Sequence, residues 1–370
     1  MKSRGDGTAR PATAGGGGRR ATQADVAKHA GVSPAIVSAV VNRRQYGNIR
    51  ISERTRQRVL ESVRTLGYSP NIAARNLAGG TNRLLGVFSW QRLFPLLKED
   101  FFYEFLVGIE EAAEEAGYNL LMLCAAKDET GARSLYPTGA NGLQLADGGL
   151  LLGWDERYDQ IRRLQEEHYP FVFVGERHIE GVEASWVGAN YLDTTAGIVD
   201  RLAGLGHRRI GLLVQAGTAN EAVAGRRAGF QLGVSRNPTV ESHTAAFGSP
   251  ASNDVPTTVT DAAQALRWVR DRRLTAVVVE SSAVAVALRT AAETAGLSAP
   301  EDFSLVGLSG TPEVPGVEHL TELSIPRRDM GREAVRLILQ RLTGATGPVT
   351  VTLPCTIRDA GTVGPPPQNS

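Results

Sequence analysis

The fold of the N-terminal part is decided by residues 24–42, which read ADVAKHAGVSPAIVSAVVN. Thr22 stands just before this stretch, where its hydroxyl can cap a helix that has Asp25 in its first turn. Gly31 supplies the tight turn between that helix and the next. Ser33 can then cap the second helix. The stretch therefore predicts two short helices joined by a tight turn.

The second helix is expected to have an apolar inward face and a small outward face. Val37, Val40 and Val41 recur at helical spacing and are expected to face the core. A helix docked in DNA presents its N-terminal residues to base edges, so the opposite face is the natural groove reader. That outward face consists of Pro34, Ala35, Ser38 and Ala39.

Polar residues at helix starts suit contacts with DNA phosphates. Helical apolar spacing covers residues 22–29, 33–40 and 52–66 with no strand alternation between them, which indicates a three-helix unit. Capped helix ends and short polar side chains hold phosphate oxygens. The residues expected in this role are Thr22, Ser33, Asn42, Ser52 and Thr55.

The net charge of +1 hides an uneven distribution along the chain. The first 80 residues hold 14 Lys and Arg against 4 Asp and Glu, whereas the remainder holds 26 against 35. A basic module on a mildly acidic body is what phosphate binding requires, although a solvated basic tail would give the same count. A three-helix bundle without a DNA role would explain the caps and the core, but not the basic bias.

The rest of the chain alternates strand and helix patterns, which is typical of an α/β fold. Short apolar strands are expected at 84–88, 120–124, 150–153, 171–174, 210–214, 276–280 and 305–308. Amphipathic helices are expected at 101–116, 194–205, 261–272 and 284–295. This alternation predicts two parallel-sheet lobes, with a binding crevice at the carboxyl ends of the strands.

The chain resembles the lactose/galactose repressor family of bacterial transcription regulators. The resemblance starts in the helix-turn-helix stretch and continues through ISERTR at 51–56, LGYSPN at 66–71 and AARNL at 73–77. Family members usually carry Thr and Arg where this chain has Ile36 and Ala39. Both residues are still assigned to the DNA-binding face, but they can make only apolar contacts there.

The resemblance also implies a hinge helix that folds only on DNA. Two such helices would lie in the minor groove, with Leu77 wedged into the central base step. Without the resemblance, Leu77 would be an ordinary apolar linker residue. The residues that the resemblance assigns to this contact are Asn71, Ala73, Ala74 and Leu77.

The resemblance extends over nearly all of the remaining chain. Its motifs are IEEA at 109–112, ADGGLL at 146–151, LGHRRIG at 205–211, RRAGF at 226–230 and PEDFSLVG at 300–307. It implies a lobe pair of the periplasmic-binding-protein type that closes around a small-molecule effector by hinge motion. The effector and the DNA would then influence each other reciprocally.

The resemblance assigns the effector site residue by residue. Phe101 and Phe102 match an aromatic pair that lines the cleft, although a helix-start core position would also suit them. Arg226 matches a guanidinium that grips ligand hydroxyls or carboxylates, and a surface salt bridge is the alternative. Its Arg-x-x-Gly-Phe spacing is expected to start a helix beside the crevice. Asn190 stands where relatives usually have Asp, and Tyr191 follows it.

Three serines of the predicted site depart from the family pattern. Ser281 and Ser282 replace an Asn-Asp pair, and Ser309 lies where relatives have carboxylates. Carboxylates clamp sugar hydroxyls, so their loss disfavours a neutral sugar held in the usual way. A sugar or sugar derivative is the family expectation. An anionic ligand, an atypical ligand and no ligand at all stay open.

The sequence gives no sign of an enzyme, a metal site or a bound cofactor. It holds no GxSxG elbow, Walker A loop or HExxH motif, and its six histidines are dispersed. Cys124 and Cys355 lie far apart without CxxC spacing and are expected to be small buried apolar residues. No signal peptide or membrane span is recognised, which favours a cytoplasmic, nucleoid-associated protein over a secreted solute-binding protein.

Five parts are therefore expected along the chain. They are a disordered extension at 1–20, a helix-turn-helix domain at 21–70, a hinge helix and linker at 71–82, a two-lobed effector-binding and dimerisation domain at 83–360 and a flexible tail at 361–370. The expected partners are double-stranded operator DNA, a second copy of the chain and a small-molecule effector. A tetramer stays open, because the tail has no heptads and argues only weakly against a coiled coil.

Overall fold

The computed structural model describes residues 21–41, 51–68, 81–93, 101–153, 157–215, 220–248, 258–259, 261–310 and 315–368. The chain divides into two compact units, Met1–Asn82 and Arg83–Ser370. Of the helices that the structure describes, none combines the length and the apolar content that a membrane span needs.

Within residues 21–41 and 51–68 of the first unit, three helices surround a small apolar core. They are α1 (Gln23–Ala30), α2 (Pro34–Val41) and α3 (Glu53–Thr65), so the three predicted helices are confirmed with their ends shifted by about a residue. Val26, Val37 and Val59 are buried at the centre of this core. Apolar side chains at helical spacing on each element are what bring the three helices together.

The turn between α1 and α2 follows the sequence prediction. The hydroxyl of Thr22 accepts a hydrogen bond from the backbone N–H of Asp25, and the Asp25 carboxylate accepts one from the N–H of Thr22, which makes a capping box. Gly31 ends α1 with φ of 61°, in the left-handed region where glycine is favoured. The Gln23 amide then donates to the Pro34 carbonyl at 2.7 Å, which ties α1 to the start of α2.

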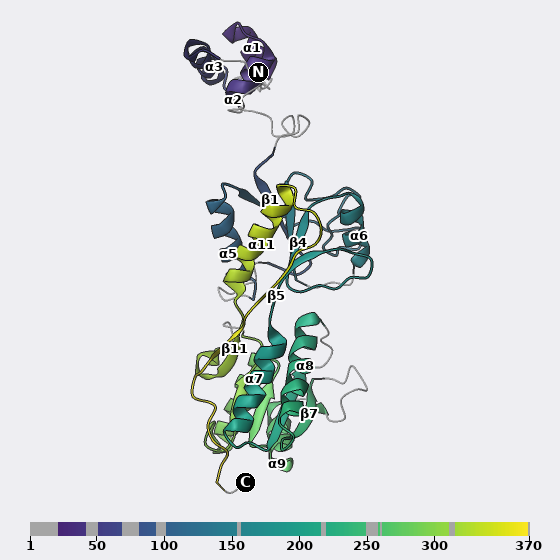
Figure 1. The fold of residues 1–370 in the computed structure, drawn as a ribbon, viewed down its shortest axis with the longest axis vertical. Helices are drawn as coiled ribbons and strands as arrows, with labels where there is room; N and C mark the ends of the chain where they lie inside the picture. The colour runs from purple at the N-terminus through teal and green to yellow at the C-terminus, as the bar shows by residue number, and fades with distance from the viewer. Residues whose placement is uncertain are drawn as a thin grey trace, which may run out of the picture. The chain divides into compact units, whose positions relative to one another are not determined.

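The second unit has two lobes, each built on one sheet (Figure 1). The first lobe has the strand order β12-β5-β4-β3-β1-β2, and all its pairings are parallel. Its strands are β1 (Leu84–Ser89), β2 (Asn119–Met122), β3 (Gly148–Leu152), β4 (Phe171–Val174), β5 (Ser185–Ala189) and β12 (Thr350–Leu353). Its helices are α5 (Tyr103–Glu115), α6 (Tyr158–Glu166) and α11 (Arg327–Leu342).

The second lobe has the strand order β13-β11-β10-β9-β6-β7-β8, in which only the β11–β13 pair is antiparallel. Its strands are β6 (Arg209–Gln215), β7 (Glu241–Phe247), β8 (Thr258–Val259), β9 (Ala276–Val279), β10 (Ser304–Gly307), β11 (Thr321–Ser324) and β13 (Thr356–Arg358). Its helices are α7 (Tyr191–Gly204), α8 (Glu221–Arg236), α9 (Ala262–Asp271), α10 (Ser282–Thr294) and the short 3₁₀ helix η1 (Val317–His319).

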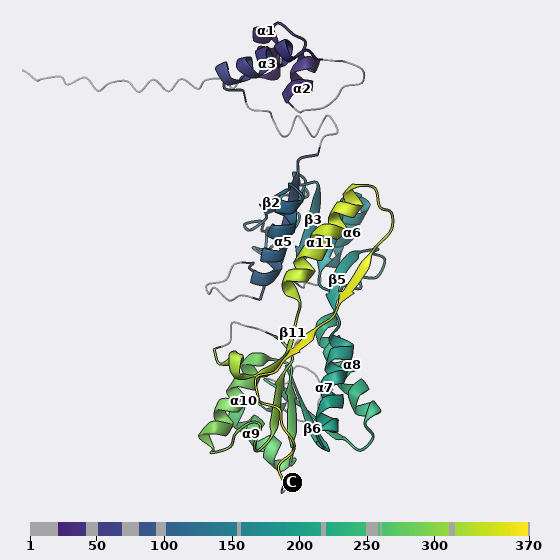
Figure 2. The ribbon, with the colours of Figure 1, turned by 60° about the vertical axis from the view of Figure 1, so that its left-hand side comes forward.

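The described chain passes between the two lobes at three places. It leaves the first lobe after β5, returns between β11 and α11, and leaves it again between β12 and β13. Figure 2 shows the last passage as the yellow segment that runs from beside β5 to beside β11. Three separate connections at one level are the arrangement that lets two lobes move as rigid bodies about a hinge.

Two glycines allow close packing of α5 against α11, which lie side by side in both ribbon views. A Cβ atom at Gly108 would overlap the carbonyl oxygen of Arg328, and one at Gly331 would overlap the carbonyl oxygen of Phe105. Backbone contact of this kind requires residues without side chains. These contacts fix the start of α11 against α5, close to the boundary between the two lobes.

The prediction of a flexible tail at 361–370 is wrong for the part that the structure describes. Thr362 is buried, its hydroxyl donates to the Leu305 carbonyl at 2.6 Å, and it accepts from the N–H of Thr321 at 3.0 Å. The Gly364 carbonyl accepts from the ring of His207 at 2.8 Å. Residues 361–368 have no apolar periodicity, and no local pattern predicts the hydrogen bonds that hold them against the second lobe.

The prediction that both cysteines are buried is also wrong. Cys124 is exposed just beyond the end of β2, and Cys355 is half-buried between β12 and β13. Both lie at strand ends, where the backbone leaves the sheet and less of the side chain is covered.

Candidate functional site

The start of α2 offers a small exposed surface of the kind expected for a groove reader. Pro34 and Ala35 are exposed, and Ser38 and Ile36 are half-buried. Ser33 is exposed, and its hydroxyl accepts weakly from the N–H of Ile36 at 3.4 Å. The N-terminal turn of α2 therefore presents small side chains to solvent.

The outward position expected for Ala39 is wrong. Its side chain is only 5% exposed, whereas the neighbouring Ser38 is half-buried. A methyl group lies close to the helix backbone, so neighbouring atoms cover it easily. Ala39 is therefore removed from the surface available to DNA.

Further polar and basic groups of this unit lie on α1 and α3. Ser52 caps α3, because its hydroxyl accepts from the N–H of Thr55 at 3.2 Å and its oxygen lies 2.9 Å from the Thr55 hydroxyl. Arg54, Arg58 and Arg64 on the same helix are exposed. The predicted residues Asn42, Asn71, Ala73, Ala74 and Leu77, the extension at 1–20 and most of the hinge segment at 71–82 lie outside the described residues.

The second unit contains a cavity of about 420 Å³ where its two sheets meet. Strand ends supply Leu152 and Gly153, Val174 and Gly175, and Gln215. The carboxyl ends of parallel strands are the usual place for a ligand in such folds. The other lining residues are Phe101, Phe102, Phe105, Arg177, Tyr191, Asn220, Ala222, Val223, Arg226, Glu280, Ser281, Ala283, Ser309 and Met330.

Five of the seven residues predicted for the effector site line this cavity: Phe101, Phe102, Arg226, Ser281 and Ser309. The rings of Phe101 and Phe102 meet edge to face at 5.3 Å between centroids. Glu280, Arg177 and Met330 also line the cavity, but they were not assigned to the effector site. These residues come after strands or at the start of a helix. A single sequence does not show which of such positions face a cavity.

Asn190 does not line the cavity. Its side-chain oxygen accepts from the N–H of Asp193 at 3.1 Å, and its amide nitrogen donates to the Asp193 carboxylate at 2.9 Å. Both ends of the amide therefore serve as the N-cap of α7. A short polar residue before a helix suits a cap as well as it suits a ligand contact, so the prediction was wrong here.

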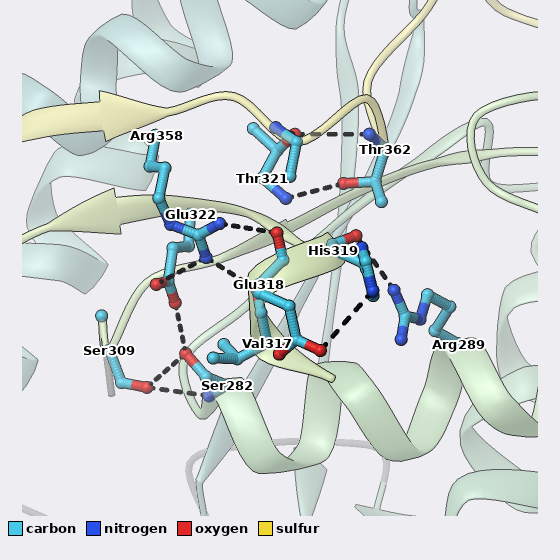
Figure 3. A network of polar contacts seen from close by, with 12 residues as sticks. Ser282, Arg289, Ser309, Val317, Glu318, His319, Thr321, Glu322, Arg358 and Thr362 are labelled. Atoms are coloured by element: carbon cyan, nitrogen blue, oxygen red, sulfur yellow. Dashed lines mark hydrogen bonds and ion pairs between the residues drawn. The ribbon is translucent and has the colours of Figure 1, made fainter. Parts of the chain in front are cut away.

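Ser282 is fully buried and belongs to a polar network behind the cavity wall (Figure 3). Its hydroxyl donates to the Glu322 carboxylate at 3.0 Å, and its N–H donates to the hydroxyl of Ser309 at 2.8 Å. Arg358 donates to the other oxygen of Glu322 at 2.9 Å. The prediction that Ser282 contacts an effector is therefore wrong, because its hydroxyl compensates a buried carboxylate instead.

Arg226 and Arg227 are sequence neighbours with different surroundings. Arg227 donates to both oxygens of the buried Glu280 carboxylate, at 2.6 and 2.9 Å, and these bonds raise the pKa of its guanidinium. Arg226 is 8% exposed, its guanidinium lies 4.4 Å from the Tyr191 ring centroid, and its Nε has no hydrogen-bond partner in the described chain. Because α8 begins at Glu221, Arg226 lies in its second turn rather than at the predicted helix start.

Two groups beside Arg226 are neutral near neutral pH. Burial raises the pKa of the Tyr191 phenol, and burial raises the pKa of the Cys355 thiol to about 11. Desolvation disfavours the charged form of each group. Neither can therefore compensate the positive charge of Arg226.

Arg177 is already compensated within the protein. Its guanidinium lies 3.2 Å from the Glu221 carboxylate and donates to the carbonyls of Glu176 and Gly153. Burial lowers the pKa of this guanidinium, and Glu221 opposes that shift. Within the described residues, no cluster of His, Cys, Asp and Glu has an arrangement that could hold a metal ion.

Both units are similar to parts of known proteins. Residues 22–71 match the family of bacterial regulatory proteins named after lacI, and residues 199–361 match the periplasmic binding protein-like domain. The regulator CelR of Thermobifida fusca is 28% identical over 339 residues, which cover 89% of this chain and 94% of CelR. Catabolite control protein A of Priestia megaterium is 26% identical and covers 87% of this chain and 92% of its own length.

Solved structures show the same fold. The lac repressor dimer, solved bound to operator and the anti-inducer ONPF, superposes with a TM-score of 0.69 at 23% identity and covers 94% of this chain and all of that one. A helix-turn-helix unit joined to a two-lobed periplasmic-binding-protein-like unit defines the class: the protein is a DNA-binding transcriptional regulator. Within that class, the DNA-binding region at residues 22–71 is of the LacI type, and regulators of the LacI family are similar to this chain over most of its length.

Proposed function

We propose that the protein represses transcription by binding operator DNA as a homodimer, and that a small molecule in the cleft of the second unit controls this binding. The observation that carries the proposal is the presence, in one chain, of a unit that matches the lacI-family DNA-binding region and a two-lobed unit with a cavity where its sheets meet. If the small molecule and the DNA favour different arrangements of the chain, each lowers the affinity for the other.

The exposed start of α2 supports the DNA-reading part of the proposal. Pro34 and Ala35 offer apolar contacts of the kind that suit thymine methyl groups, and Ser38 can donate or accept at a base edge. Thr22, Ser33, Ser52 and Thr55 would hold phosphates from the helix starts. Ile36 would contribute only its exposed edge.

The three passages between the lobes support the control by a small molecule. A ligand that contacts both lobes favours the closed arrangement, because only that arrangement completes its contacts. The lac repressor neighbour is named as a dimer bound to operator and to an anti-inducer, which supports a homodimer and a ligand-dependent operator affinity for this chain. The site of action would be the nucleoid in the cytoplasm.

A charge introduced at the start of α2 tests the proposal. Ala35→Asp places a carboxylate against base edges and phosphates, so we expect operator affinity to fall by about tenfold or more. Ala125→Asp, at an exposed position of the second unit, is the matched control and should leave operator affinity unchanged. The measurement is an equilibrium titration of the full chain on a DNA fragment selected from its genome. Equal affinity of Ala35→Asp and the unmodified chain would contradict the proposal.

A further inference from the structure

Most of the surface that lines the cleft is apolar. Phe102 and Phe105 come from the start of α5, Leu152 and Val174 end two strands of the first lobe, and Met330 lies in the first turn of α11. Aromatic and branched side chains bury apolar ligand surface, and they offer nothing to the hydroxyls of a carbohydrate. The cavity therefore favours a ligand whose body is aromatic or aliphatic.

The buried carboxylate of the cleft is already in use. Glu280 has a side chain only 3% exposed, and it accepts from Arg227 at 2.6 and 2.9 Å and from the N–H of Gln215 at 2.7 Å. Both oxygens of the carboxylate thus have donors from the protein. The protein thus occupies three of the roughly four acceptor positions of this carboxylate, which leaves little for the hydroxyls of a sugar.

The hydroxyls of the cleft are used in a similar way. The Ser309 hydroxyl donates to the Ser282 hydroxyl at 2.7 Å and accepts from the N–H of Ser282 at 2.8 Å. The Ser281 hydroxyl accepts from the N–H of Val284 at the start of α10. The acceptors that a polyhydroxylated ligand needs are therefore mostly turned toward the protein.

Arg226 is a guanidinium of the cleft wall that no ion pair compensates within the described residues, whereas the buried Arg327 beside the cleft donates to the carbonyls of Ser309 and Gly310. Arg226 is more than nine-tenths buried, its Nε lacks a hydrogen-bond partner, and no ion pair joins it to a described carboxylate. By contrast, Arg177 is paired with Glu221. A buried guanidinium without a counter-ion is costly, and an anion in the cleft would remove that cost.

We propose that the effector is a monocarboxylate with an aromatic or branched aliphatic body, held by Arg226 over Tyr191. This inference rests on the proposed function, because it names the ligand class of that same cleft. One uncompensated guanidinium matches one negative charge, and a carboxylate can accept two of its N–H groups at once. The apolar walls then bury the body of the ligand.

The test compares matched probes on the full chain by isothermal titration calorimetry. The probes are benzoate and 3-phenylpropionate, their uncharged amides, and glucose. We expect both carboxylates to bind more tightly than their amides by about tenfold or more, and glucose not to bind. Arg226→Gln should weaken the carboxylates by about tenfold to a hundredfold and leave the weak binding of the amides unchanged. Arg236→Gln, at a half-exposed pair on the same helix, is the control and should change neither.

Three results would overturn the inference: glucose binding as tightly as the carboxylates, amides binding as tightly as their acids, or no carboxylate binding at all. A parallel operator titration separates this failure from failure of the proposed function. If glucose binds and changes operator affinity, the sensor function stands and the ligand class is wrong. If benzoate binds through Arg226 but operator affinity does not change, the ligand class stands and the control of DNA binding is wrong.

Discussion

At the scale of single residues, Thr22 begins α1 through two reciprocal hydrogen bonds with Asp25. The Thr22 hydroxyl accepts from the backbone N–H of Asp25 at 3.3 Å, and the backbone N–H of Thr22 donates to the Asp25 carboxylate at 2.8 Å. Such a box satisfies amides that have no partner within the helix. The short helix α1 has only eight residues, so the cap is a large share of its local stability.

Thr22→Ala should therefore loosen α1. The loss of the cap is expected to cost about 1 kcal/mol and to speed amide exchange in residues 23–30 by roughly fivefold. Hydrogen exchange of the full chain, followed by mass spectrometry, measures this directly. Thr294→Ala removes a hydroxyl that bonds only to the Thr290 carbonyl on α10, so it should leave exchange in α1 unchanged. Unchanged exchange in the Thr22 variant would show that the cap does not hold the helix.

Residue types and spacing predicted most of the helix-turn-helix but only part of the cleft. Thr22, Gly31 and the valines of α2 act through local rules, which one sequence is enough to apply. Arg226 and Arg227 are the same residue type at adjacent positions, and only the fold places Glu280 beside one of them. The Asn190 side chain caps α7 through its near neighbour Asp193, a role that suits a short polar residue as well as a ligand contact does. The role of Ser282 depends on Ser309 and Glu322, which are distant in sequence.

At the scale of elements, the contact of α5 with α11 depends on two glycines. Gly108→Ala would drive its Cβ into the Arg328 carbonyl, so the helices must separate, and we expect destabilisation of about 1–3 kcal/mol. Gly197→Ala on α7 is the control. A Cβ atom added there would meet no described atom of another element within 4 Å, so the substitution should stabilise its helix by about 0.5–1 kcal/mol.

Urea unfolding of the full chain provides the measurement for both glycine variants. We expect a lower unfolding midpoint for Gly108→Ala and an equal or higher one for Gly197→Ala. If Gly108→Ala were as stable as the unmodified chain, the close approach of α5 and α11 would not exist.

The central strands of both sheets could be predicted, but several peripheral elements could not. β1, β3, β4, β9 and β10 are short and largely apolar, which is typical of buried parallel strands. Others were missed because they contain polar residues or are very short. In β11, for example, Glu322 is buried and paired with Arg358, an arrangement that no local pattern predicts.

At the scale of the whole molecule, the second lobe is held together partly by His207. Its ring is fully buried, lies 2.9 Å from the Thr275 hydroxyl and donates from Nε2 to the Gly364 carbonyl at 2.8 Å. Burial lowers the pKa of the imidazole below its usual 6.5, with a smaller opposing effect from the Gly364 bond. The folded protein therefore keeps the neutral ring where the unfolded chain would already take up a proton.

This difference predicts acid sensitivity. The stability contributed by neutral His207 is fully present above the unfolded pKa, and it is lost as the pH falls below about 6.5 toward the folded pKa. The melting temperature of the full chain should fall between about pH 7.5 and pH 5.5. His207→Gln should flatten this part of the profile, and His168→Gln, at an exposed position, should not. An identical fall in the His207 variant would assign the effect to other groups.

We expect this chain to read a specific DNA sequence as a dimer through its first unit. One helix-turn-helix buries too little surface for specific affinity, so two copies should read two related half-sites. Footprinting of the full chain on a selected genomic fragment, over a range of protein concentrations, tests this most directly. We expect a protected region with two-fold symmetry whose occupancy falls when the protein is diluted. Protection of a single asymmetric half-site, unchanged by dilution, would contradict it.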